Sequence, residues 1–186
     1  MESTNTIFFQ YYKSTIGELI LGSYEDELCL LDFRYRKMRS AVDKRIQSGL
    51  NAEFVDKDTP FLKSVRLQIS AFLKGEQTSF SLPIKMVGSS FQLNVWYALQ
   101  SIPYGKTISY LELALQIGDK NAVRAVASAN GANALALIVP CHRVIGSTNK
   151  LVGYAGGLYS KKKLLQLELT QSHNPNELPF WESETS

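Results

Sequence analysis

The hydrophobic pattern of this 186-residue chain changes its period near Gly88. Before that glycine, short runs rich in Ile, Leu, Phe and Tyr are separated by Gly17 and by a polar stretch, which is typical of an antiparallel meander. A helix is then expected from Thr59, where a capping hydroxyl precedes Pro60 and an apolar stripe at helical spacing. The expected strands are Ile7–Tyr12, Ile16–Gly22 and Leu28–Phe33.

After Gly88 the pattern predicts short helices separated by glycine-containing turns. Ser89 or Ser90 is placed to cap the first of them, and Ser109 the second. Helix, tight turn, helix is the order that a helix-turn-helix needs. On the pattern alone, a pair of packed helices without nucleic acid is the favoured interpretation. The expected helices are Phe91–Gln100, Tyr110–Ile117 and Asn121–Asn130.

These patterns predict two domains and a tail. Residues 1–88 are expected to form a structural α/β domain, and residues 89–172 a mostly helical one. Residues 89–172 hold 8 basic and 3 acidic residues, a balance compatible with a polyanion partner but weak evidence by itself. Residues 173–186 form a polar tail with three glutamates and no Lys or Arg.

Composition excludes several classes of protein. Two cysteines, Cys29 and Cys141, are too few for a disulfide framework or a four-cysteine zinc site. No apolar run approaches the roughly 18 residues of a membrane span, and the first residues show no secretory signal. We therefore expect no metal, no cofactor, no membrane, and a reducing cytoplasm or nucleus as the compartment.

The segment around Cys141 carries the chemistry. An apolar, strand-like run leads into Pro140, which fixes a rigid bend before the cysteine. His142 and Arg143 both favour the thiolate, the nucleophilic form of Cys141. Since neighbours in a strand point apart, His142 would act through a bend or a bridging water, with Glu168 as its orienting carboxylate. The competing interpretation is a packed cysteine in a buried strand.

Several motifs of the second half occur together in an order and spacing that resemble the O6-alkylguanine-DNA alkyltransferases. The resemblance is strong over residues 85–170 and rests in the first third only on strand content. Its motifs are Phe91…Val95-Trp96, Ile102-Pro103-Tyr104-Gly105-Lys106-Thr107-Ile108-Ser109-Tyr110, Ala122-Val123-Arg124-Ala125-Val126, Asn133, Ile138-Val139-Pro140-Cys141-His142-Arg143-Val144, Gly153-Tyr154-Ala155-Gly156-Gly157 and Lys163-Leu164-Leu165…Glu168.

The resemblance implies a DNA repair protein that moves an alkyl group from O6 of guanine, and more weakly from O4 of thymine, to Cys141. The product is a thioether, so the protein acts once. The site is expected to lower the pKa of Cys141, with His142 as the base acting through water. Glu168 would hold the other imidazole nitrogen, and Asn133 would tie the helix-turn-helix to the active-site segment.

The resemblance also implies that the target base leaves the duplex through the minor groove and enters a pocket. Arg124 would fill the space left in the stack, and Tyr110 would donate a hydrogen bond to the purine N3. Small residues of the recognition helix, Ala129 among them, would let its backbone approach the groove. The residues expected at the DNA are Arg124, Tyr110, Ala125, Ala127 and Ser147.

The glycine-rich loop would wall the pocket, because glycines let the backbone approach a ligand. Ala155 stands where some relatives carry a serine, so a larger alkyl group is expected to fit. Residues expected in the pocket are Tyr154, Ala155, Gly156, Gly157 and Val144. Five basic residues are placed to meet phosphates, and not all of them can face one duplex, so binding is expected to be modest and salt-sensitive, with little sequence preference. They are Lys106, Lys120, Arg124, Arg143 and Lys150.

The fold that the resemblance implies is a ribonuclease-H-like α/β domain followed by a winged-helix-like domain, acting as a monomer on double-stranded DNA. Two other functions stay open on the residues alone. One is a winged-helix DNA-binding regulator with a structural or redox cysteine. The other is a cysteine hydrolase that turns over and needs no DNA.

Overall fold

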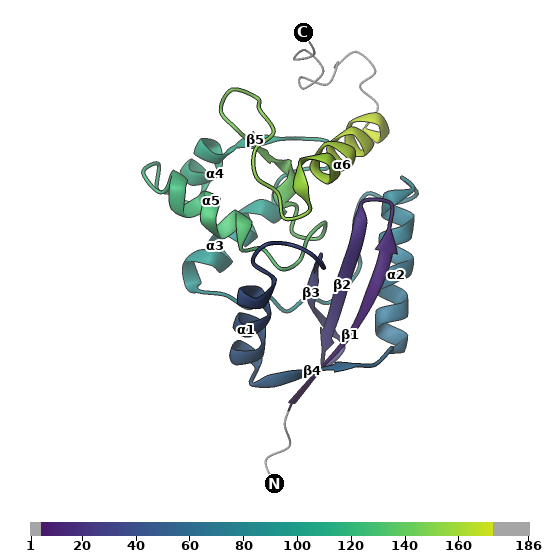
Figure 1. Ribbon diagram of the computed structural model, residues 1–186. Coiled ribbons are helices and arrows are strands. Elements are labelled where there is room, and N and C mark those ends of the chain that lie inside the picture. The colour runs from purple at the N-terminus through teal and green to yellow at the C-terminus, as the bar shows by residue number, and fades with distance from the viewer. Residues whose placement is uncertain (1–4, 173–186) are drawn as a thin grey trace.

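The computed structural model describes residues 5–172, so the polar tail 173–186 lies outside the described residues. A sheet with a helix on each face forms the first half, and helices form most of the second (Figure 1). Within residues 5–172 no helix is long and apolar enough to cross a bilayer.

The first-half elements are β1 (Asn5–Ser14), β2 (Gly17–Tyr24), β3 (Glu27–Phe33), α1 (Arg39–Leu50), β4 (Ala52–Asp56) and α2 (Pro60–Leu73). The second half has α3 (Ser90–Gln100), β5 (Ile108–Ser109), α4 (Tyr110–Gln116), α5 (Val123–Gly131), the 3-10 turn η1 (Cys141–Arg143), β6 (Val144–Ile145) and α6 (Gly157–Gln171).

The sheet of the first half is mixed, not the antiparallel meander with one helix that the sequence suggested. Strands β1, β2 and β3 pair antiparallel as expected, but β4 pairs parallel to β1 and completes the order β3-β2-β1-β4. The sequence pattern predicted neither β4 nor α1. Only Val42 and Ile46 of α1 are buried, so the helix carries too few apolar residues for a helical stripe to stand out.

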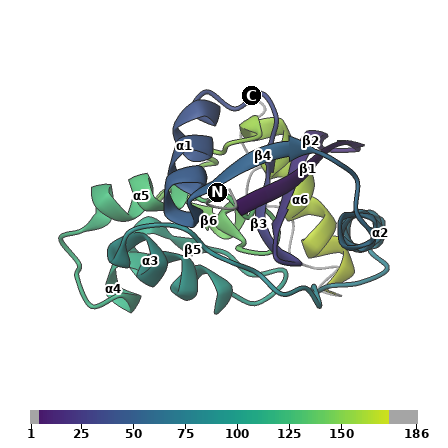
Figure 2. The same cartoon turned by 90° about the horizontal axis from the view of Figure 1, so that it is seen from below.

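Both faces of the sheet are covered by helices. Leu19 and Leu21 of β2 belong to the core that includes α2, whereas Ile20 between them packs with α1. This alternation is the two-residue period of a strand whose two faces are both buried. Viewed from below, α1 and α2 lie on opposite sides of the strands (Figure 2).

The first two helices of the second half, α3 and α4, begin at side-chain caps, as the sequence predicted. Ser89 caps α3, where its hydroxyl accepts from the Gln92 amide and the Gln92 side chain accepts from the Ser89 amide. Ser109 and Glu112 make the same reciprocal pair at the start of α4. Such capping boxes satisfy two backbone donors that a helix start leaves free.

The apolar run before Cys141 is not a strand. Leu137 has a left-handed φ of 72°, and turns occupy most of the segment until β6 begins. The run instead touches the edge strand β3 once: the Leu31 amide donates to the Ala134 carbonyl at 2.8 Å, and the Ala136 amide donates to the Leu31 carbonyl at 2.7 Å. The active-site segment is therefore docked on the sheet of the first half.

One continuous core joins the two halves. Buried side chains of β2, β3 and α2 contact buried side chains of α3, the segment 135–139 and α6. The Trp96 indole of α3 donates to the Ala129 carbonyl of α5 at 2.8 Å, which fixes those two helices to each other. In α6 the Ser160 hydroxyl donates to the Ile16 carbonyl at 2.7 Å, so the last helix is also anchored to the β1–β2 turn.

The cap of α3 gives a direct test of this local structure. Ser89→Ala is expected to lower the free energy of unfolding by about 1 kcal/mol, because the Gln92 backbone amide loses its acceptor. Ser90→Ala, one residue into the same helix, is the matched control and should change stability by less than about 0.5 kcal/mol. Urea unfolding of both variants measures the difference, and equal losses would contradict the assignment of Ser89 as the cap.

Candidate active site

Cys141 is the first residue of η1, directly after Pro140, and only 5% of its surface is exposed. The Asn133 side-chain amide donates to the Cys141 sulfur at 3.2 Å and to the Val139 carbonyl at 2.8 Å. The same side chain accepts from the Leu135 amide through its oxygen at 2.9 Å. Asn133 thus has all its polar atoms engaged, and its amide is aimed at the sulfur.

A cavity of about 380 Å³ opens beside the Cys141 sulfur. Its volume falls in the range of small-molecule sites, which is roughly 300–1,000 Å³. Its walls come from four parts of the chain: the β3–α1 connection, the α4–α5 pair, the segment 133–141 and the loop before α6. The lining includes Asp32, Tyr35, Arg36, Lys37, Tyr110, Ala127, Asn130, Asn133, Tyr154, Ala155 and Gly157.

Glu168 of α6 lies buried under η1 and binds its neighbours with both carboxylate oxygens. One oxygen accepts from His142 Nε2 at 2.7 Å, and both oxygens accept from the Arg143 guanidinium, at 2.9 and 3.0 Å. The Gly105 amide donates to the carboxylate as well, at 3.0 Å. A carboxylate with this many donors stays ionised even when no water reaches it.

The pKa values agree with that charge distribution. Although burial opposes ionisation of Glu168, the contacts with His142 and Arg143 hold its pKa at about 2. Burial lowers the pKa of His142, with Glu168 acting in the opposite direction. His142 is therefore neutral near pH 7, and Arg143 is the cation that balances Glu168.

The tautomer of His142 follows from these contacts. An ionised carboxylate only accepts, so Nε2 of His142 must carry the ring proton that it donates to Glu168. Nδ1 is then an unprotonated acceptor; it is buried, and no described residue donates to it. This nitrogen is free to take a proton, which is what a general base requires.

The expectation of a lowered pKa at Cys141 is wrong for the free protein. Burial raises the pKa of the thiol, and the charge of Asp32 adds to that effect. The Asn133 amide and the positive charges of Lys161 and Arg36 act in the opposite direction. The thiol is thus protonated at rest, and a base must receive its proton when it reacts. Cys29 has a pKa raised to about 12 by burial and lies in the sheet, away from this chemistry.

Lys161 of α6 is fully buried and was missed in the sequence. Its ammonium donates to the carbonyls of Val144, Val152 and Gly153, at 2.6, 2.7 and 3.2 Å. Burial lowers the pKa of Lys161 to about 8, while the nearby Cys141 favours the charged form. Three donated bonds need all three ammonium protons, so the charged lysine fastens the loop before α6 to the active-site segment.

The recognition-helix residues divide between solvent, cavity and core. Arg124 and Ala125 are exposed on α5, and Ala127 lines the cavity. Ala129 is buried under Trp96, so the expectation that it faces DNA is wrong. Residues two apart point away from each other on a helix, so the three alanines cannot share one face. Ser147 is exposed in the turn after β6.

Other predicted site residues are partly rearranged. Tyr154, Ala155 and Gly157 line the cavity as expected, and Tyr110 faces it from the start of α4. Val144 does not: its side chain is fully buried in the core. Gly156 does not line the cavity either, but packs on Phe33, where an added Cβ would come within 2.3 Å of the ring.

The Arg143 side chain is not available to contact a DNA phosphate in this structure. It was expected to face DNA, yet it is 7% exposed and is held by Glu168 and by the Ile102 carbonyl, to which it donates at 2.7 Å. Among residues 5–172, no three His, Cys, Asp or Glu side chains gather in a way that could hold a metal ion.

Two family models match the chain. One, described as the 6-O-methylguanine DNA methyltransferase ribonuclease-like domain, matches residues 7–86. The other, the DNA binding domain of the same family, matches residues 90–170. The methylated-DNA–protein-cysteine methyltransferase of Methanosarcina barkeri is 42% identical over 87% of this chain and 97% of its own. The enzyme of the same name from Mycobacterium leprae is 44% identical, over 85% of this chain and 90% of its own.

The chain belongs to this family of DNA alkyltransferases. Among solved structures, the Mycobacterium tuberculosis OGT in complex with DNA is similar with a TM-score of 0.76 and 39% identity. That match covers 88% of this chain and 94% of the other. The arrangement of an α/β half followed by a helical half is thus shared with a structure of the family.

The alkyltransferase site predicts a pH-dependent contribution of Glu168 to stability. Because its pKa is about 2 in the folded protein and 4.5 in the unfolded chain, ionised Glu168 contributes about 3 kcal/mol at pH 7. That contribution is complete above pH 4.5 and is lost as the pH falls toward 2. Glu168→Gln should therefore be less stable than the wild type at pH 7, with the gap narrowing below pH 4.5.

Urea unfolding at several pH values measures this gap. Glu53→Gln, at an exposed glutamate of β4, serves as the matched control and should leave stability unchanged at every pH. A gap between wild type and Glu168→Gln that stays constant from pH 5 to pH 3 would show that the charge of Glu168 is not what stabilises the site.

Proposed function

We propose that this alkyltransferase takes the alkyl group from O6 of guanine in duplex DNA and keeps it on Cys141. The observation that carries the proposal is a cavity-lining thiol that is followed in the chain by a neutral imidazole of fixed tautomer. A redox or structural cysteine needs no such base. The family names of the relatives, which state methyl transfer to a protein cysteine, support the same reaction.

The proposed step is a displacement at the alkyl carbon. The Cys141 thiol proton passes to His142 Nδ1 through a bridging water, since residues adjacent in η1 do not face each other directly. The sulfur forms a bond to carbon as the bond between carbon and O6 breaks, and guanine leaves with the electron pair. The proton is finally taken up by the guanine ring, so the net products are a thioether and unmodified guanine.

Tyr110 is proposed to stabilise the departing guanine by donating to its N3. Burial raises the pKa of Tyr110 to about 12, and the nearby Cys141 acts in the same direction. The hydroxyl therefore stays protonated and remains a donor throughout the reaction. A donor placed in advance where negative charge develops lowers the barrier without reorganisation.

The thioether has no leaving group that water displaces easily, so each molecule acts once. Ala155 puts no side-chain donor at the cavity wall, and we infer that alkyl groups larger than methyl are accepted. O4-alkylthymine is proposed as a weaker substrate, because it presents a related alkoxy group to the same sulfur.

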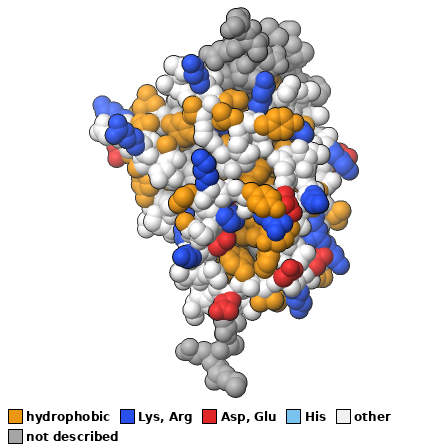
Figure 3. Space-filling view, in the orientation of Figure 1, with side chains coloured by type: hydrophobic (Ala, Val, Ile, Leu, Met, Phe, Trp, Pro, Cys, Tyr) orange, Lys and Arg blue, Asp and Glu red, His pale blue; other side chains and the backbone are white. Residues whose placement is uncertain are grey.

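Double-stranded DNA is the proposed partner, with α5 entering the minor groove and Arg124 filling the stack. The exposed Arg124 and Ala125 on α5 support this placement, as does the DNA complex of the similar Mycobacterium tuberculosis OGT. In this view a winged-helix-like second half follows a ribonuclease-H-like first half, and the protein acts as a monomer. Lys and Arg side chains are scattered over the face seen in Figure 3, which fits modest, salt-sensitive binding.

Whole-protein mass spectrometry after incubation with O6-methylguanine duplex tests the reaction. The mass should rise by one methyl group, located on Cys141 by peptide mapping, with one event per molecule. Cys29→Ala is the matched control and should still accept one methyl, whereas Cys141→Ala should bind the duplex and accept none. DNA binding without any mass change would favour a regulator, and repeated turnover would favour a hydrolase.

The role of Tyr110 has its own test. Tyr110→Phe should slow methyl transfer under single-turnover conditions by about 100-fold, because one donor to the leaving group is lost. Tyr97→Phe, at an exposed tyrosine of α3, is the control and should transfer at the wild-type rate. If Tyr110→Phe keeps the wild-type rate at saturating DNA, then the hydroxyl does not assist the leaving group.

A further inference from the structure

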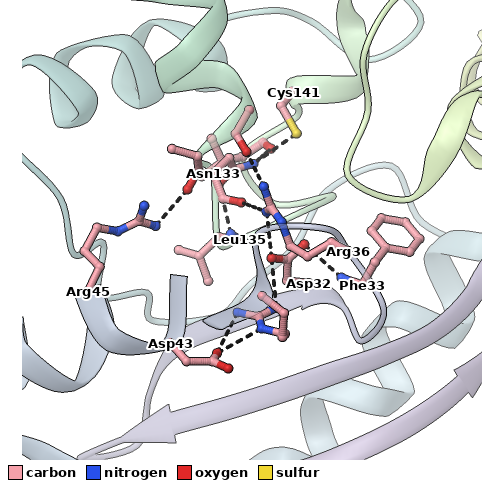
Figure 4. A network of polar contacts seen from close by, with 12 residues as sticks. Asp32, Phe33, Arg36, Asp43, Arg45, Asn133, Leu135 and Cys141 are labelled. Atoms are coloured by element: carbon pink, nitrogen blue, oxygen red, sulfur yellow. Dashed lines mark hydrogen bonds and ion pairs between the residues drawn. The ribbon is translucent and has the colours of Figure 1, made fainter. Parts of the chain in front are cut away.

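Two arginines of the first half bind the carbonyls at the end of helix α5. Arg36 donates to the Asn133 carbonyl at 3.0 Å and also to the Gly131 carbonyl. Arg45 donates to the Ala132 carbonyl between them, at 2.7 Å. Figure 4 shows the two guanidinium groups approaching this turn from the first half of the chain. Cations at a helix C-terminus satisfy its free carbonyls and complement its dipole.

Arg36 is itself fixed by a buried carboxylate. Asp32 is fully buried at the end of β3, where it accepts from Arg36 at 2.8 Å and from Arg39 at 3.0 Å. Its other oxygen accepts from the Phe33 amide at 2.8 Å. The Arg36 side chain is 6% exposed, so this pairing is shielded from solvent. A planar guanidinium held in this way presents its remaining donors in fixed directions.

Asn133 connects this network to the reactive sulfur. Its carbonyl is bound by Arg36, while its side-chain amide donates to Cys141 (Figure 4). One and three residues further along, the backbone hydrogen bonds of Ala134 and Ala136 hold the chain on Leu31 of β3. The first half therefore fixes the backbone at Asn133 through Arg36 and the backbone just after it through Leu31. The side-chain amide of Asn133 is the part that projects toward the Cys141 sulfur.

The guanidinium of Arg36 binds Asp32 and two backbone carbonyls of the turn after α5 at the same time. We propose that Arg36 is a positioning residue of the alkyl-transfer reaction. It holds Asn133 so that the side-chain amide of Asn133 stays hydrogen-bonded to the Cys141 sulfur. The proposal rests on the function proposed above. It changes the expected role of the first half, which then takes part in the reactive site. It also links the end of the helix proposed to bind DNA to the group that reacts.

The alternative is that Arg36 only stabilises the contact between the two halves. Arg39 separates the two roles, because it pairs with the same Asp32 but otherwise binds Asp43 of α1. Loss of either arginine leaves Asp32 with one cation fewer. Only loss of Arg36 releases Asn133.

The titration of the Cys141 thiol depends on every charged or titratable group that faces the sulfur. These groups come from the β3–α1 connection, α4, η1, the loop before α6 and α6 itself. They are Asp32, Tyr35, Arg36, Lys37, Tyr110, His142, Tyr154 and Lys161. All except Arg36 are kept in the variants below, so a change in the titration of Cys141 reports on the position of Asn133 and the charge of Arg36.

The experiment measures labelling of Cys141 by iodoacetamide against pH, without DNA, with the modified peptide quantified by mass. Arg36→Met should raise the apparent pKa of Cys141 by about one unit and slow labelling near neutral pH about tenfold. Asn133→Ala should shift the pKa of Cys141 in the same direction, and a double variant that combines Asn133→Ala with Arg36→Lys, which keeps the positive charge, should add no further shift. Arg39→Met should lose stability yet keep the wild-type profile.

Arg36→Lys keeps the charge and covers the case in which Arg36→Met does not fold. A lysine cannot span both carbonyls and Asp32, so the upward shift should persist; a wild-type profile would mean that charge alone matters and would overturn the proposal. Additive shifts in the double variant would overturn it too, as would an unchanged profile in Arg36→Met. Since no alkylated DNA is present, failure of the proposed function would instead appear only in the methyl-transfer assay.

Discussion

The buried carboxylate of Glu168 is the interaction on which the reactive site depends. It collects donors from a helix-preceding turn at Gly105 and from both His142 and Arg143 of η1. Without it the imidazole would have neither a defined tautomer nor a fixed ring plane. One side chain on the last described helix thereby sets the protonation of the group next to the nucleophile. Removing it would also leave Arg143 as an unpaired buried charge, which is costly.

The electrostatics around Cys141 combine opposing effects. Burial holds the thiol protonated, which protects a single-use nucleophile from unproductive reactions with small electrophiles. Lys161, Arg36 and the Asn133 amide surround the same sulfur with positive charge and a donor. These groups are in place before the proton leaves, so the thiolate is stabilised when it forms. Preorganised charge of this kind needs no rearrangement during the reaction.

Local sequence signals predicted the parts of the fold that depend on local physics. The three strands, the Thr59 and Ser89 caps and the helix starts at Pro60 and Tyr110 follow from residue periodicity and capping chemistry. The pairing of Cys141, His142 and Glu168 came from motif order, and the structure brings the last two into contact. The family assignment from those motifs is confirmed by the matched relatives.

What the sequence could not show depends on long-range placement. Lys161 stands in a run of three lysines, and no local signal distinguishes the buried one from its exposed neighbour Lys162. The left-handed turn at Leu137 arises because the segment must bond β3 and then reverse toward η1, which apolar periodicity does not encode. Asp32 and Arg36 became part of the site only because the edge of the first sheet lies against the end of α5.

The continuous core that spans both halves has a consequence for how the molecule unfolds. Leu31 of β3 and Leu135 of the active-site segment share one apolar cluster, and α6 returns to contact the β1–β2 turn. Separating the halves would expose that cluster on both, so neither is a self-sufficient folding unit. The chain should lose its structure in a single cooperative transition, and a cut in the connection between α2 and α3 should leave a nicked protein that holds together.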